Sequence, residues 1–230
     1  MTPRDFNASI RSTYHFLEEC KILRSATAFR TMEASGEFRE LALVSTTPYR
    51  NVFLCGLRNG DYNFLLKDYA YFQFTFGEKD RYRFAYYPNP FAIGEEGLHE
   101  MDALLEQGVI SFEEYSDLLS EQPYEVTKPA IRFELDCNAY VRLSHPAAHF
   151  HIGMHSENRW PVCRRLTPRS FALMIVKLYY GDKWGTGRLD RELEGFINRF
   201  DYYFVAEKRK CDQLGHDLFH AQERDQMHLA

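Results

Sequence analysis

The chain has 230 residues, which is enough for one domain with a substantial hydrophobic core. Apolar residues make up 45% of it and charged residues 27%, a balance that excludes an intrinsically disordered protein. The net charge of −5 argues against a surface that coats nucleic acid, although it leaves room for a local basic pocket.

The cysteines and the apolar runs point to a reduced protein that has no membrane partner. The five cysteines are scattered and include no CxxC pair, so they indicate neither a zinc knuckle nor a disulfide scaffold. The first residues lack the hydrophobic region of a signal peptide. No apolar run approaches the roughly 18 residues that span a bilayer. We therefore expect a cytoplasmic protein.

The first part of the chain predicts a helix followed by strands. Residues 3–23 place apolar side chains at helical spacing, which predicts an amphipathic helix. Residues 38–87 contain short aromatic-rich runs separated by turn signals, which predicts an antiparallel meander of about four or five strands. The runs cover 41–44, 51–55, 62–66, 69–76 and 82–86. Polar and apolar residues alternate in the fourth run, so we expect one buried and one half-polar face.

The second part predicts a helical insertion, further strands and more helices. Residues 94–121 are rich in carboxylates and predict an acidic helical hairpin, broken at Gly108, with a capping box from Ser111 to Glu114. Strands are expected at 131–135, 139–143 and 149–154. Thr167 then caps an apolar helix that ends at Gly181, and a last helical region begins near Arg188.

These elements combine into one fold prediction. The class is α+β, with a mostly antiparallel, aromatic-rich sheet covered by the N-terminal helix and by the helix that follows Thr167. The acidic hairpin is inserted between two halves of the sheet. No boundary divides the chain, so residues 1–230 are expected to form a single domain.

A histidine-rich strand is the strongest pointer to a functional site. Four of the nine histidines lie between residues 145 and 155. Since alternate residues of a strand share a face, His149, His151, Gly153 and His155 should point one way. The neighbouring strands would add polar side chains to that face: Arg132, Glu134, Asp136, Tyr140 and Arg142.

The leading functional hypothesis is metal-free phosphodiester cleavage. His149 and His151 would act as the acid–base pair, while Arg142 and Arg159 would stabilise the phosphate. RNA supplies its own nucleophile, so the chain is a candidate cytosolic phosphodiesterase or ribonuclease, with a toxin or defence effector as one biological role. Four further residues are candidates for anion binding: Arg164, Arg165, Tyr140 and Arg132.

Several alternatives stay open. No cofactor is expected on the leading hypothesis, but His149 and His151 could hold a divalent metal ion, completed by Glu134 or Glu157, although the cupin spacing is not met. A histidine-triad nucleotide hydrolase is disfavoured because Gly153 interrupts the pattern. The histidines could also be structural, or belong to a non-enzymatic module that binds a nucleotide or a protein partner. Burial against carboxylates would argue against catalysis by histidines, and an open pocket near Arg142 or Arg159 would favour anion chemistry.

A run of about forty residues carries a family resemblance. It contains HFHIG at 149–153, NRWPV at 158–162 and LTP at 166–168, followed by an apolar run that ends at Tyr180. The pattern resembles a family of uncharacterised bacterial proteins with a domain of unknown function. That resemblance implies bacterial origin and no established activity. More loosely, the order of an arginine-bearing strand and a histidine-rich strand is similar to some small bacterial ribonuclease toxins.

Overall fold

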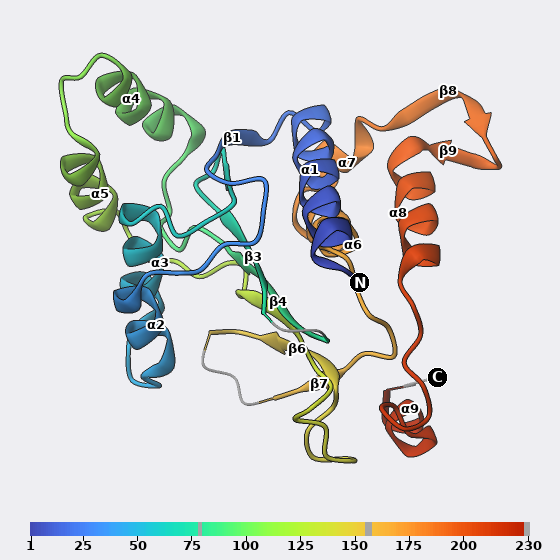
Figure 1. The fold of residues 1–230 in the computed structure, drawn as a ribbon. Coiled ribbons are helices and arrows are strands. Elements are labelled where there is room, and N and C mark those ends of the chain that lie inside the picture. The colour runs from blue at the N-terminus through green and yellow to red at the C-terminus, as the bar shows by residue number, and fades with distance from the viewer. Residues whose placement is uncertain (78–79, 155–157, 228–230) are drawn as a thin grey trace.

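A single antiparallel sheet organises the molecule in the computed structural model, which describes residues 1–77, 80–154 and 158–227 (Figure 1). Its strands follow the order of the chain, and each pairs with the next. They are β1 (Leu23–Ala26), β2 (Phe64–Leu66), β3 (Tyr71–Phe76), β4 (Arg81–Tyr87), β5 (Ile131–Asp136), β6 (Ala148–Ile152) and β7 (Trp160–Pro161). The predicted α+β class with an aromatic-rich antiparallel sheet is therefore confirmed.

Helices lie on both sides of this sheet, and a two-stranded hairpin stands apart from it. The helices are α1 (Pro3–Glu19), α2 (Gly36–Leu43), α3 (Tyr49–Arg58), α4 (Glu95–Glu106), α5 (Phe112–Ser120), α6 (Pro168–Tyr179), α7 (Gly181–Gly185), α8 (Arg199–Lys210) and α9 (Ala221–Met227). The hairpin consists of β8 (Arg188–Leu193) and β9 (Phe196–Asn198). Among the residues described, no helix combines the length and the apolar character that crossing a bilayer requires.

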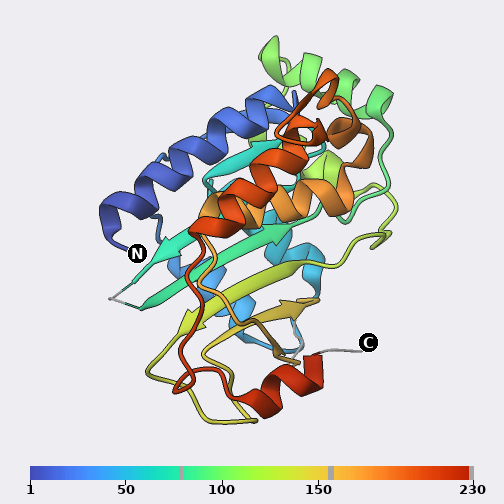
Figure 2. The ribbon, with the colours of Figure 1, turned by 90° about the vertical axis from the view of Figure 1, so that its right-hand side faces the viewer.

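One face of the sheet packs against α1 and α6, and α8 packs on α6 (Figure 2). The apolar stripe of α1 is buried, as its helical spacing predicts: Phe6 packs against Phe84 of β4, and Phe16 packs against Phe200 of α8. At the start of α6, the side chain of Thr167 accepts a hydrogen bond from the backbone N–H of Ser170, and Pro168 occupies the first turn. The two helices that the sequence expects over the sheet therefore lie on this face.

The opposite face carries α2 and α3, where the sequence predicted strands. Residues 41–44 include the end of α2, and residues 51–55 lie inside α3, so both strand predictions were wrong. The reason is that a short, continuously apolar run fits a buried helix as well as a buried strand. As a result both faces of the sheet are covered: Tyr71 and Gln73, expected on a half-polar face, are buried.

The predicted strand at 139–143 is also absent, and β6 pairs directly with β5. The carboxylate of Asp136 accepts hydrogen bonds from the backbone N–H groups of Asn138 and Ala139, which turns the chain away at the end of β5. A second turn follows, in which Leu143 adopts a left-handed backbone with φ of 64°. The loop replaces the strand and leaves the histidines of β6 beside β5.

Two further predictions had opposite outcomes. The acidic helical hairpin is confirmed as α4 and α5, and the capping box is present: the Glu114 side chain accepts from the Ser111 N–H at 2.8 Å.

The region from Arg188, predicted as helical, begins instead with the β8–β9 hairpin. Glu194 and Gly195 form its turn with φ of 48° and 83°, a conformation that glycine favours at the second position.

The position of α3 against the sheet can be tested at Gly56. A methyl group there would meet the hydroxyl of Tyr71 and lie 2.9 Å from the ring of Phe38. We expect Gly56→Ala to lower the free energy of unfolding by about 1–3 kcal/mol through overpacking, although alanine favours an isolated helix. Urea denaturation would measure it, with Gly36→Ala as the control because its added methyl meets no atom within 4 Å. Equal stability of both variants would contradict this packing.

Candidate metal centre

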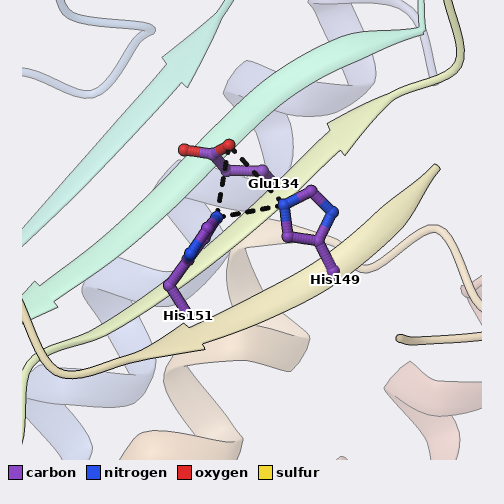
Figure 3. Close-up of side chains that lie close together, drawn as sticks. All are labelled: Glu134, His149 and His151. Atoms are coloured by element: carbon purple, nitrogen blue, oxygen red, sulfur yellow. Dashed lines mark hydrogen bonds and ion pairs between the residues drawn. The ribbon is translucent and has the colours of Figure 1, made fainter. Parts of the chain in front are cut away.

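The direct pairing of β5 with β6 assembles a polar cluster on one face of the sheet. Glu134 is paired with His149, and Arg132 with His151. Residues two apart on a strand share a face, so all four side chains emerge on the same side. Figure 3 shows the two imidazoles of β6 and the carboxylate of β5 pointing toward one another. On the reverse face, Phe133 and Phe150 pack ring against ring at 5.5 Å.

Three of these side chains form a compact triangle. His149 Nε2 lies 3.0 Å from His151 Nε2, and these atoms lie 3.8 and 3.7 Å from Glu134 Oε2. The point in the plane of the three atoms that is equidistant from them lies about 2.0 Å from each, which matches zinc bonds to imidazole nitrogen and carboxylate oxygen. Among the described residues, no other three side chains of metal-ligating type bring their ligand atoms within 4.8 Å of one another.

Outer contacts orient the triangle. The Nδ1–H of His149 donates to the carbonyl oxygen of Pro146 at 2.8 Å, and since a carbonyl only accepts, the Nε2 atom keeps its lone pair. Arg132 Nε forms an ion pair with Glu134 Oε1 at 2.7 Å, which leaves Oε2 directed at the histidines. Metal-ligating histidines and carboxylates in proteins are held by such outer partners.

The protonation states also suit a cation. Burial of His149, whose side chain is 1% exposed, lowers its pKa to about 4, so the imidazole is neutral at neutral pH. Burial raises the pKa of Glu134, but its interaction with His151 and the positive charges of Arg132 and Arg83 outweigh that effect and bring the pKa to about 2. A neutral imidazole and an ionised carboxylate are the forms that bind metal ions.

The predicted catalytic residues are only partly brought together. His149 and His151 are adjacent, but both are buried and lie against a carboxylate, the arrangement that argues against metal-free acid–base catalysis. Arg142 donates from Nη2 to the Gln222 side chain of α9 at 2.7 Å. Arg142 is therefore engaged with α9. Arg159 is exposed in the segment before β7.

The predicted anion-binding residues have intramolecular partners. Arg164 donates to the carbonyl oxygen of Cys211 at 2.8 Å, and Arg165 forms an ion pair with Asp80. The hydroxyl of Tyr140 donates to the buried carboxylate of Glu223 at 3.1 Å, and Arg132 is paired with Glu134. Two residues named from the sequence, His155 and Glu157, lie outside the described residues.

Sequence reasoning missed the arginine beside the triangle. Arg83 of β4 is paired with Glu134 of β5, and β4 lies on the side of β5 that is away from β6. The side chain of Arg83 emerges on the same face of the sheet as the triangle. Glu134 and Arg83 line a cavity of about 530 Å³, together with Thr75, Arg39 and Arg81. The alternation around Arg83 in residues 82–86 marked it as a polar-face residue, but no local pattern tells which strand lies beside it.

Comparison with known proteins gives a family without an assigned activity. The model of the uncharacterized conserved protein family DUF2290 matches residues 17–230, so the chain belongs to that family. No curated protein matches the chain. No solved structure matches it either. Function therefore has to be argued from the site.

The buried cluster predicts acid sensitivity of the metal-free protein. Because the folded-state pKa of His149 is about 4 rather than 6.5, the unfolded chain binds the proton more readily, and stability falls as the pH drops from 6.5 to 4. Glu134, whose pKa falls from 4.5 to about 2, adds a second loss as the pH drops from 4.5 toward 2. Denaturation with urea at each pH in EDTA would measure both losses.

Replacement of His149 isolates the loss of stability between pH 6.5 and 4. We expect His149→Gln to remove on the order of 3 kcal/mol of the decline between pH 6.5 and 4. His15 is the matched control because its side chain is 76% exposed on α1, so His15→Gln should follow the parent curve. Parallel curves for the parent and His149→Gln would show that this histidine is not held neutral.

Proposed function

We propose that this member of the DUF2290 family is a metal-dependent phosphodiesterase whose catalytic ion is bound by Glu134, His149 and His151. The observation that supports it is the triangle of Nε2, Nε2 and Oε2 atoms, whose size suits one divalent ion. Two histidines and one glutamate are the ligand set of several zinc hydrolases, and they leave a fourth position for water.

In the proposed chemistry, the metal ion takes the place of the buried histidine pair, which the sequence predicted to act as acid and base. Glu134, His149 and His151 would hold the ion, which would supply a nucleophile from water at neutral pH. Hydrolysis would form one phosphorus–oxygen bond and break the bond to the leaving group, whose oxygen would take a proton from solvent. With a nucleophile supplied from water, the substrate would need no 2′-hydroxyl. The expected substrate class includes RNA and also phosphodiesters that lack a 2′-hydroxyl.

The second candidate is a non-enzymatic binding module, and one observation favours a structural rather than catalytic role for the cluster. Without an ion, the three groups satisfy one another, since the histidine rings share a hydrogen bond at 3.0 Å and both approach the Glu134 carboxylate. In that case the cluster would fasten β6 to β5. The same substitutions would then cost stability and change no metal affinity.

Metal binding separates the two candidates. We expect isothermal titration calorimetry with Zn²⁺ or Mn²⁺ to give one site, and Glu134→Gln or His149→Gln to weaken binding at least about 100-fold because each replaces a strong ligand with a neutral amide. Hydrolysis of bis(p-nitrophenyl) phosphate and of single-stranded RNA should stop in EDTA and return with the ion. His15→Gln is the control histidine variant. A folded parent protein that binds neither ion would overturn the proposal and leave the binding module.

A further inference from the structure

We propose that Arg83 binds the phosphate of the substrate, and that this substrate is a nucleotide-sized phosphodiester held in the cavity beside Glu134. The inference rests on the proposed metal-dependent activity and goes further by naming the residue that recognises the anion and the size class of the substrate. It is carried by the position of Arg83, by the absence of a hydrogen bond or ion pair to its side chain among the described residues, and by the dimensions of the cavity.

Position is set by strand register. Arg83 of β4 is paired with Glu134 of β5, which is paired with His149 of β6, so the three residues form one row across the sheet. Neighbouring strands lie about 4.8 Å apart, so Arg83 stands one strand from Glu134 and two from His149. An arginine side chain easily spans the distance to the neighbouring strand. A phosphate bound to an ion at the triangle would therefore lie within reach of the guanidinium of Arg83.

Charge compensation distinguishes Arg83 from the arginines around it. Arg132 is paired with Glu134 at 2.7 Å, and Arg81 approaches Asp136 at 3.5 Å. The side chain of Arg83 is half-buried and places positive charge near Glu134, but within the described part of the chain it forms no hydrogen bond or ion pair. A partly buried guanidinium whose donors are unused is unfavourable, and its fork of donors matches a phosphate. Thr75, opposite Arg83 on β3, adds a hydroxyl to the same wall.

The size of the cavity suits a small substrate. Its volume of about 530 Å³ falls within the roughly 300–1,000 Å³ typical of small-molecule pockets. A long nucleic acid needs an extended row of phosphate contacts, which a chain of net charge −5 is poorly equipped to supply. Arg39 and Arg81 add positive charge to the cavity wall, but Glu33 and Asp136 line it as well, so no extended basic surface forms there. A dinucleotide or a cyclic nucleotide fits this arrangement better than the interior of a polymer.

Substitution of Arg83 tests the inference in the metal-loaded protein. We expect Arg83→Gln to lower kcat/KM for bis(p-nitrophenyl) phosphate and for a dinucleotide by about 100-fold, because one charged phosphate contact is lost. Inhibition by inorganic phosphate should weaken in parallel. Arg83→Lys should restore part of both effects, since lysine keeps the charge without the fork. Arg11→Gln is the matched control: Arg11 is exposed on α1 and does not line the cavity, so its loss should change kcat/KM less than about threefold.

The outcomes separate this inference from the proposed function. If the ion binds and Arg83→Gln hydrolyses substrate and responds to phosphate like the parent, the role of Arg83 is overturned while the metal site stands. If no ion binds, the proposed function fails, and calorimetry with inorganic phosphate in EDTA shows whether the Arg83 site stands alone. Loss of phosphate binding only in Arg83→Gln would support it; equal binding would overturn it. Cleavage of long RNA as efficient as that of the dinucleotide would overturn the size class.

Discussion

The antiparallel pairing of β5 with β6 is the constraint on which the rest of the site depends. It sets Glu134 opposite His149 and Arg132 opposite His151, and directly opposed residues in such a pair have Cβ atoms about 5 Å apart. That distance lets two imidazoles and one carboxylate converge on a common point without any long loop. The turn after Asp136 makes this pairing available, because the chain reverses there instead of adding a strand between the two.

The hydrophobic core holds the same register in place. Phe133 and Phe150 alternate with the polar residues of β5 and β6 and pack beneath the sheet. A slip of one residue would place these rings among the arginines and bury the carboxylate in the apolar core. Packing and site geometry therefore favour the same alignment. The free energy gained by burying the aromatic face also fixes the distances between the ligand atoms on the polar face.

The local pattern of the sequence predicted some of the elements and residues that form the site, but not all of them. Alternation predicted the strand at 131–135, the strand at 149–154 and the shared face of Glu134 and Arg132, and capping residues predicted the start of α6. The run at 51–55 failed because its apolar side chains carry no period that separates a buried helix from a strand. Arg83 was missed for another reason: its neighbour Glu134 lies far along the chain, beyond the acidic hairpin, and strand pairing at that distance leaves no local signal.

The cluster is organised before any ion arrives, and this bears on what an ion would contribute. Pro146 already fixes the tautomer of His149, and Arg132 already orients the Glu134 carboxylate, so little side-chain entropy would be lost on binding. The ion would displace the hydrogen bond between the two histidine rings and gain three ligand bonds. Since the unfolded chain lacks this preformed triangle, the binding energy would stabilise the fold, and it would do so most where β5 meets β6. The groups that would perform the chemistry are thus also the groups that would fasten the end of the sheet.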